Sequence, residues 1–567
     1  MIKLDYPDIL ETIKDYLVPG RTESASFLAW YLSNFYRLDP VEIDDSICDK
    51  RGDKGVDGIY LNDNDNTVDI FQSKISQRSD VTIGDTILKE FLGTLSQFKD
   101  RESIENMIAS AGDGEISKLI KRLELLDKIT SYSVRGIFLS NIELDANGIA
   151  FLAMTSIIQS IGPIQITKEY ISDTRSKLIP KEFSFDVLGY DISTYTVDAK
   201  TKSILAPVKA QELVMLDGIN DQSIFDANLR GDLGNTKVNK DIVESIKDQA
   251  KHKLFPLFHN GINIITEELK IDEKRTKLFV KGYGVVNGCQ SMRSLFNHSK
   301  YLSADLRIFT RFIQVDKTSD LLNIITSYSN NQNGIKARDF KSNHDIQIRL
   351  QNEFKKFYSG QYFFEIKRGE DAGGKVVISN EFAGLLLLAF DLKEPWTTHQ
   401  KYKVFDDLYS DLFARPEVDA DRIVTLFLFM EEIIKSLPKI DDKLLASYAL
   451  TRYLMLYILR EILEKDTTGA KLINKPTTFV RDAKFRKPLT HCIQGILSDM
   501  VVDINAELKE IKEKEKDFDY KSKLKSPEWT KTFSKTIVNI YEKLVQRGRV
   551  ESFEKEWTKK MGGIKSA

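Results

Sequence analysis

The sequence predicts an α/β (α+β) protein with an N-terminal mixed sheet and flanking helices, a central α+β region and a largely helical C-terminal region. Helical and strand-like periods alternate over the first 170 residues, strand-like runs with glycine turns dominate from there to about 315, and helical spacing prevails beyond 380. The chain has 567 residues, more than the roughly 250–300 that one core supports. We therefore expect three domains, at 1–170, 171–380 and 381–567.

The composition excludes several classes of protein. Hydrophobic residues make up 42% and charged residues 29%, which suits packed cores and excludes disorder throughout. With 82 Lys+Arg against 84 Asp+Glu the net charge is -2, which excludes a globally basic protein but leaves room for a local basic groove. Cys48, Cys289 and Cys492 lie far apart, so neither a disulfide scaffold nor a structural zinc site is expected. No signal-peptide or membrane-length apolar run is evident, so we expect a cytoplasmic protein with no membrane partner.

The elements of the first 170 residues follow from the changing period. Residues 8–37 read as one or two amphipathic helices, and then GVDGIYL (55–61) and TVDIFQSKIS (67–76) are β-rich runs joined by a polar turn, which predicts a hairpin. Helical spacing returns from about 84 to 130, and SYSVRGIFLS predicts a strand. A helix near 148–160 and a last strand at PIQITKEY (163–170) complete the expected order.

Three polar residues of the hairpin are placed to meet on one patch. Asp57 stands where the first strand starts, and Gln72 and Lys74 lie two residues apart on the second, so both project from the same face. A carboxylate with a neutral oxygen donor suits Mg²⁺ or Mn²⁺, and a nearby lysine can orient or activate the attacking water. The pattern therefore points to metal-dependent hydrolysis of phosphodiester bonds.

The G-V-D of 55–57 followed by the Q-S-K of 72–74 resembles the PD-(D/E)xK nuclease core in its Mrr-like variant. The resemblance covers about the first 170 residues and implies a restriction-endonuclease-like mixed sheet. It implies that Asp57 and Gln72 bind the metal and that Lys74 is the catalytic lysine. Such folds often add an acid from the first helix, for which Glu23 is the nearest candidate.

The alternative is that Asp57 and Gly58 form a turn and that Gln72 and Lys74 face solvent on an edge strand. The order of the surrounding elements favours the nuclease interpretation. Asp53, a second acid in the same loop, is expected to shape the Asp-Lys-Gly turn.

A second group of polar residues lies between 220 and 415. VVNGCQSMRSLF (285–296) predicts a strand, an Asn-Gly turn and a helix start whose main-chain N–H groups can bind an anion. Amide side chains nearby can read base edges or a nucleotide, although each alone is also a common turn or cap residue. The candidate ligand-binding residues are Asn260, Asn287, Gly288, Gln290, Arg293, Asn331 and Gln332.

Several blocks of this region resemble, in order, the AIPR family, named for abortive-infection phage resistance. They are FDANLRGDLG, FPLFHNGINII, VVNGCQSMRSLF, SYSNNQNGIKARDF and WTTHQKYKVFDDLY, within about 220–415. The chain departs from the family pattern at Ser291, where Thr is usual, and at His259, where the family has Asn. The resemblance implies a role in bacterial phage defence.

The C-terminal half adds two weaker signals. INKPTTFVRDAKFRKPLTH (473–491) interleaves basic residues with aromatics, which suits a phosphate backbone, but an exposed loop between helices is the favoured interpretation. The apolar helices between 380 and 465 predict either an interior or a homo-oligomer surface.

Together these observations predict a Mg²⁺-dependent endonuclease controlled by the AIPR region. We expect its nucleic-acid partner to be DNA, with RNA as an alternative and a nucleotide or phage-derived molecule as its trigger. The competing interpretation is a non-catalytic nucleic-acid or nucleotide sensor.

Overall fold

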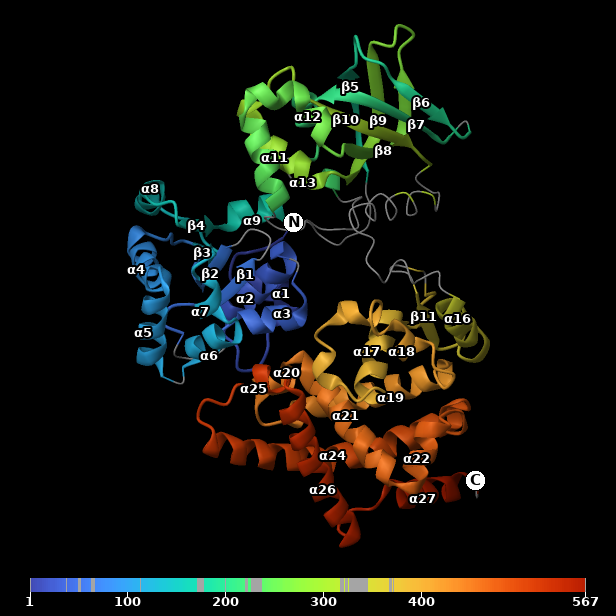
Figure 1. The fold of residues 1–567 in the computed structure, drawn as a ribbon. Coiled ribbons are helices and arrows are strands. Elements are labelled where there is room, and N and C mark those ends of the chain that lie inside the picture. The colour runs from blue at the N-terminus through green and yellow to red at the C-terminus, as the bar shows by residue number, and fades with distance from the viewer. Residues whose placement is uncertain are drawn as a thin grey trace.

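The structure is a computed structural model that describes three units with separate hydrophobic cores (Figure 1). The described residues are 2–36, 38–48, 53–62, 67–112, 114–170, 178–198, 200–219, 223–225, 237–316, 321, 325, 345–366, 370 and 372–565.

The N-terminal unit is a four-stranded mixed sheet with both faces covered. Its strands run in the order β1-β2-β3-β4; β1 and β2 form the predicted antiparallel hairpin, and β3 and β4 are parallel to β2. One face packs on α2 and the other on α4, which gives two cores on either side of the sheet. The strands are β1 (Gly58–Asn62), β2 (Thr67–Lys74), β3 (Ser133–Ser140) and β4 (Ile158–Ile161). The helices are α1 (Asp8–Thr12), α2 (Glu23–Tyr31), α3 (Pro40–Ser46), α4 (Asp85–Leu95), α5 (Arg101–Ala111), α6 (Glu115–Arg122), α7 (Leu125–Lys128), α8 (Ala146–Met154) and α9 (Pro163–Glu169).

The end of this unit differs from the sequence-based prediction. The strand lies at Ile158–Ile161, over the end of the helix expected near 148–160, and the segment predicted as a strand is helix α9. Gly162 precedes this helix and Pro163 occupies its first turn, where a missing N–H costs nothing. The Glu143 carboxylate accepts the Ile164 N–H at 2.7 Å, so an acid far back in the sequence caps the helix.

The central unit is a six-stranded sheet with its main core on one face and a small cluster of Ile265, Val286 and Val315 apart from that core. The strand order is β5-β9-β8-β10-β7-β6, and β8 and β10 are its parallel pair. The strands are β5 (Ile179–Asp186), β6 (Ser193–Thr196), β7 (Lys202–Lys209), β8 (Ile262–Ile271), β9 (Lys277–Asn287) and β10 (Arg307–Gln314). The helices are α10 (Ala210–Leu213), α11 (Lys237–Lys247), α12 (Phe255–Phe258) and α13 (Cys289–Asn297). Helix α11 falls in a stretch that the sequence suggested was mostly strand.

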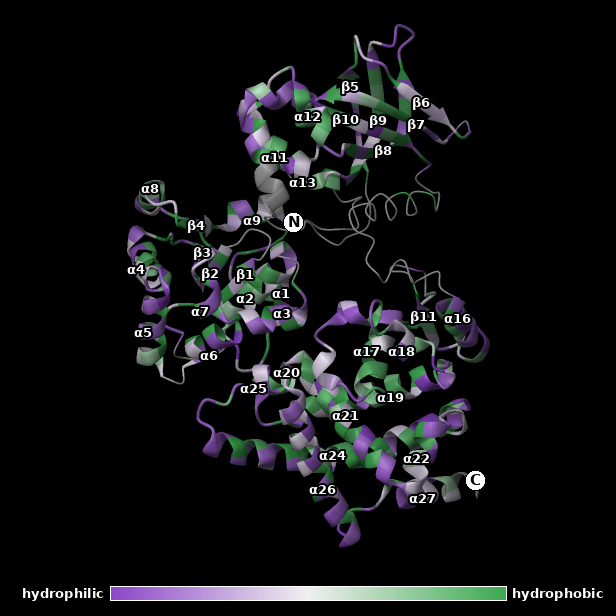
Figure 2. Ribbon diagram, viewed as in Figure 1, coloured by the Kyte–Doolittle hydropathy of each residue, from purple (hydrophilic) through white to green (hydrophobic). Residues whose placement is uncertain are grey.

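The C-terminal unit is helical, as predicted, apart from a short parallel pair formed by β11 (Tyr362–Glu365) and β12 (Val376–Ser379). This pair and α16 (Asp345–Phe357) belong to the same core as the helices after residue 380. Figure 2 shows hydrophobic colouring along the central helices α17, α19 and α21, which pack in that core. Those helices and the others of the unit are α17 (Asn380–Phe390), α18 (Tyr409–Phe413), α19 (Ala420–Ser436), α20 (Lys443–Ser447), α21 (Ala449–Lys465), α22 (Thr467–Asn474), α23 (Thr477–Val480), α24 (Ala483–Lys514), α25 (Tyr520–Lys523), α26 (Pro527–Gln546) and α27 (Phe553–Lys565).

Helix α3 connects the N-terminal and C-terminal units. Its Val41 side chain is buried in the core of the C-terminal helices, whereas Ile43 is buried in the core beneath the N-terminal sheet. Among the helices of the described ranges, none is long and apolar enough to cross a bilayer.

Candidate functional site

Asp57 is held in place immediately before β1 by three hydrogen bonds. Its N–H donates to the Phe71 carbonyl at 2.9 Å, its carbonyl accepts from the Cys48 N–H at 3.0 Å, and its Oδ2 accepts from the Ser73 N–H at 2.8 Å. Burial raises the pKa of Asp57 to about 6; the Ser73 N–H and the Lys74 ammonium oppose that rise, and Asp53 adds to it. This carboxylate therefore carries a charge that the protein only partly compensates.

Gln72 is the neighbour of Asp57 across the hairpin, because Gly58 pairs with Phe71. Its side chain is 8% exposed, and Nε2 donates to the Gly55 carbonyl at 3.3 Å. Its Oε1 is buried and has no hydrogen-bond partner among the described residues. Leaving such an acceptor unsatisfied costs about 1–3 kcal/mol. The amide oxygen is thus available to a cation.

The interpretation of Gln72 as a solvent-facing residue on an edge strand is wrong. Strand β2 is an interior strand of the sheet, flanked by β1 and β3, and Gln72 is buried. Lys74, two residues on, is exposed at the end of the same strand. The hairpin therefore brings together the acid, the amide oxygen and the ammonium that the sequence placed there.

Glu23 is only near this group. Helix α2 begins against the end of β2, since the Ser73 hydroxyl donates to the Ser24 carbonyl at 2.8 Å and the Ile75 N–H donates to the Ser24 hydroxyl at 3.1 Å. No hydrogen bond or ion pair within the described residues joins Glu23 to the hairpin residues. Among all the residues that the structure describes, no group of three or more His, Cys, Asp or Glu side chains could hold a metal ion.

Asp53 has the role in the turn that the sequence indicated. Its Oδ1 accepts the Gly55 N–H at 2.9 Å. Lys54 and Gly55 both have positive φ, at 54 and 81 degrees, which makes a tight turn before β1. The turn points the Gly55 carbonyl at the Gln72 amide and so helps to orient it.

Two glycine turns lie together in the central unit, where β8 begins and β9 ends. Gly261 and Gly288 have φ of 85 and 88 degrees, and a Cβ on Gly288 would lie 2.8 Å from Ile262 Cγ1 and 3.2 Å from the Gly261 carbonyl oxygen. Only glycine fits this approach. The turn and helix start predicted from VVNGCQSMRSLF are confirmed, with Gly288 as the N-cap of α13.

His259 joins the two turns, a role that the sequence did not reveal. Its Nδ1 accepts the Gly261 N–H at 3.0 Å, so Nε2 carries the proton and donates to the Ser291 hydroxyl at 2.7 Å. Burial lowers the pKa of His259 to about 4, which keeps the ring neutral at physiological pH. The only sequence signal was that both positions depart from the family pattern.

The structure describes some of the other predicted ligand-binding residues of this region and not the rest. Asn260 is exposed, Asn287 pairs with Asn263 at the end of β9, and the Arg293 guanidinium lies 5.5 Å from the centre of the Phe225 ring. Asn260 and Asn287 directly precede the turn glycines Gly261 and Gly288, whereas Arg293 lies further along α13. The Gln290 side chain, Asn331 and Gln332 lie outside the described residues.

A model of the family described as AIPR protein matches residues 225–543, more than half of the chain. The chain belongs to the AIPR family. No curated protein and no solved structure matches it. The AIPR match extends well past residue 415, through most of the C-terminal helices, and it leaves the unit containing Asp57 and Gln72 unmatched.

Inside the AIPR region, the basic segment at 473–491 is not a loop: it lies in α22, α23 and α24, with two-residue connections between them. Arg481 forms an ion pair with Asp421, whose side chain is fully buried, and its guanidinium lies 3.6 Å from the centre of the Phe357 ring. Arg486 donates to the Val480 carbonyl at 2.8 Å and to Gln361 at 2.6 Å. Both guanidinium groups therefore bind partners within the protein. Lys475, Lys484 and Lys487 are the basic residues of this segment that are exposed.

The cysteines of this AIPR protein are buried thiols. Cys48, Cys289 and Cys492 are all free, and each belongs to the core of a different unit. Burial raises the pKa of the Cys492 thiol to about 12, which makes it a poor nucleophile.

Proposed function

We propose that this AIPR protein is a metal-dependent nuclease of phage defence, and that its N-terminal unit hydrolyses phosphodiester bonds, with DNA as the expected substrate. One observation carries the proposal: the buried Gln72 Oε1 has no hydrogen-bond partner among the described residues and lies beside Asp57, whose charge is poorly compensated. A divalent cation would satisfy both groups at once. The family name supports the role in defence.

Each hairpin residue has a distinct task in this proposal. Asp57 and Gln72 would hold Mg²⁺ or Mn²⁺, which supplies positive charge to the phosphate and lowers the pKa of a nearby water. The Ser73 N–H fixes the Asp57 carboxylate. Lys74, exposed at the strand end, is free to meet the phosphate or to orient the attacking water.

A binding function for the central unit is the second candidate. The first turn of α13 has a glycine N-cap that supplies no side-chain acceptor, so its N–H groups suit an anion. Asn287 and Asn260 directly precede the two turn glycines, and Arg293 lies on α13 itself. A nucleotide or phage-derived trigger would bind there and leave the N-terminal unit as a nucleic-acid platform or as an enzyme that waits for the trigger.

The proposal is tested by cleavage of plasmid, single-stranded DNA and RNA in Mg²⁺, Mn²⁺ and EDTA. Asp57→Asn is the sharper variant because its side chain can still accept the Ser73 N–H, whereas Asp57→Ala leaves that donor unsatisfied. We expect Asp57→Asn, Asp57→Ala and Lys74→Ala to lose metal-dependent cutting, and Lys99→Ala, an exposed lysine of the same unit, to keep it. Full activity in Asp57→Asn would refute the site. Binding of nucleic acid in EDTA without cutting in metal would favour the platform.

A further inference from the structure

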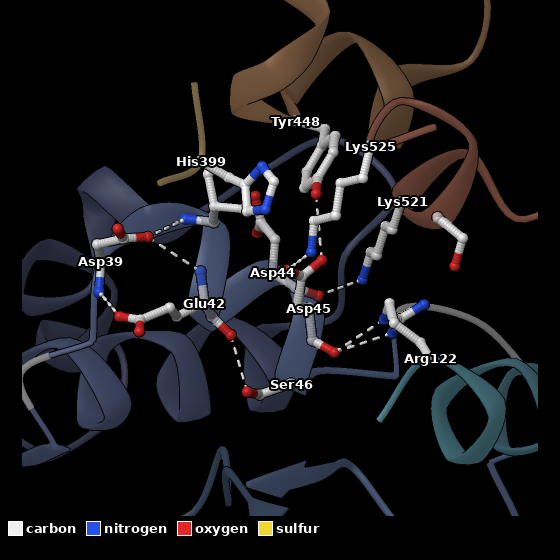
Figure 3. A network of polar contacts seen from close by, with 12 residues as sticks. Asp39, Glu42, Asp44, Asp45, Ser46, Arg122, His399, Tyr448, Lys521 and Lys525 are labelled. Carbon is white, nitrogen blue, oxygen red and sulfur yellow. Dashed lines mark hydrogen bonds and ion pairs between the residues drawn. The ribbon is translucent and has the colours of Figure 1, made fainter. Parts of the chain in front are cut away.

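Helix α3 ends with two carboxylates, Asp44 and Asp45, where the helix dipole disfavours negative charge. The AIPR region supplies much of the compensation (Figure 3). Lys525 forms an ion pair with Asp45, and the Tyr448 hydroxyl donates to the same carboxylate at 3.1 Å. Arg122 of the N-terminal unit donates to the Asp45 carbonyl at 2.9 Å. The end of α3 is therefore completed by residues from a distant part of the chain.

Lys521 makes the most buried of these contacts. It lies on α25, its residue is 2% exposed, and its Nζ donates to the main-chain carbonyls of Asp44 and, at 3.1 Å, Ile47. An ammonium at the carbonyl end of a helix is favoured by both the hydrogen bonds and the dipole. Two carbonyls at the end of α3 thus share one buried cation from the AIPR region.

The Ile47 carbonyl is connected to the candidate metal site through one peptide group. The Ile47 carbonyl and the Cys48 N–H belong to one planar peptide group. Lys521 binds the oxygen of that group, and the Asp57 carbonyl accepts its N–H at 3.0 Å. Ile47 also bridges Gly58, the residue after Asp57. A single rigid group thus lies between the lysine and the main chain of Asp57.

We propose that Lys521 is a positioning residue for Asp57, through which docking of the AIPR region onto α3 sets the geometry of the metal site. This inference rests on the proposed nuclease function for its consequence, but the contact can be tested without turnover. A partner that lifts α25 away from α3 would loosen Asp57 and weaken metal binding. While the AIPR region is docked on α3, it keeps Asp57 in the geometry that binds the metal.

The test labels the thiols of the full chain with N-ethylmaleimide and follows each cysteine by peptide mass spectrometry. Cys48 lies in the coupling peptide, whereas Cys289 and Cys492 lie in the other two cores and report global opening. Lys521→Met is compared with Lys525→Met, which removes an ion pair to the Asp45 side chain but leaves the Ile47 carbonyl bound. Calorimetric titration with Mn²⁺ is run on the same proteins.

We expect Lys521→Met to speed labelling of Cys48 alone and to weaken Mn²⁺ binding, each by about tenfold, because hydrogen bonds from a charged donor are lost. Lys525→Met should leave both near wild type. Burial raises the pKa of the Cys48 thiol and the Lys521 ammonium partly lowers it, so loss of the lysine would by itself slow labelling. Faster labelling therefore reports opening. Wild-type labelling, or unchanged Mn²⁺ affinity, in Lys521→Met would overturn the proposal.

A measurement on the wild-type chain covers the case in which Lys521→Met opens all three cysteines alike. Coupling is reciprocal, so Mn²⁺ bound at Asp57 must slow Cys48 labelling, and Asp57→Asn must remove that protection. Labelling that is unchanged by saturating Mn²⁺ would contradict the coupling. A wild type that binds no Mn²⁺ and cuts nothing would count against the proposed function instead. The contact is then tested by labelling alone: faster labelling of Cys48 in Lys521→Met than in Lys525→Met supports it, and equal labelling overturns it.

Discussion

Replacing Gln72 by glutamate puts a carboxylate at the buried oxygen without changing the size of the side chain. Position 72 is 8% exposed and lies beside Asp57. Without a cation, the new acid must be protonated or must face a second negative charge, which we expect to cost about 2–4 kcal/mol of unfolding free energy at pH 7.

A divalent cation reverses the sign of this effect. Two unit charges about 4 Å apart attract by about 4 kcal/mol at an effective dielectric constant of about 20, and part of this offsets the desolvation of the carboxylate. We expect Gln72→Glu to bind Mn²⁺ about tenfold or more tightly than wild type. At a Mn²⁺ concentration of about one hundred times Kd, binding adds about 2.7 kcal/mol to stability.

The assay is thermal unfolding in EDTA and in Mn²⁺, with Gln347→Glu as a matched control. Gln347 is fully buried in the C-terminal core, and its Oε1 likewise has no partner among the described residues. Both variants should unfold at a lower temperature in EDTA, and Mn²⁺ should restore Gln72→Glu alone. Mn²⁺ that rescues neither variant, or both equally, would refute the reasoning.

Three further predictions concern stability. The pKa of His259 is about 4 in the folded protein and 6.5 in the unfolded chain. The contribution of His259 to the free energy of unfolding is therefore fully present above pH 6.5 and is lost as the pH falls toward 4, by about 2 kcal/mol at pH 5 in urea unfolding. His259→Gln should remove much of this pH dependence. Arg481→Met leaves buried Asp421 without its ion pair and should cost about 3–5 kcal/mol, whereas exposed Lys484→Met should change little. Gly136→Ala should cost about 1–3 kcal/mol, because its Cβ would lie 2.4 Å from a leucine methyl; wild-type thermal stability in this variant would contradict the packing.

Local patterns were enough to predict the hairpin and the meeting of Asp57 with Gln72 across it. The alternation of 55–61 and 67–76 and the turn between them fix the register, so Asp57 and Gln72 meet as the sequence indicated. The prediction for PIQITKEY failed because its β-branched residues favour a strand locally, whereas the Gly-Pro start favours a helix. The cap on that helix comes from Glu143, 21 residues away. Short-range propensity cannot show such a cap.

Contacts between residues far apart in the chain could not be predicted for the same reason. His259 and Ser291 are 32 residues apart, and Lys521 and Ile47 are 474 apart. Nothing in the local pattern at 520–525 distinguishes the buried Lys521 from the half-buried Lys523 and Lys525. Only the packing of α25 against α3 shows that Lys521 binds the carbonyls at the end of α3.

The most direct measurement is Mn²⁺-dependent cleavage of DNA by the wild-type chain and by Asp57→Asn under identical conditions, with EDTA as the blank. The nuclease account predicts cutting by the wild type only, and only with metal present. Equal cutting by both proteins, or cutting that persists in EDTA, would contradict it.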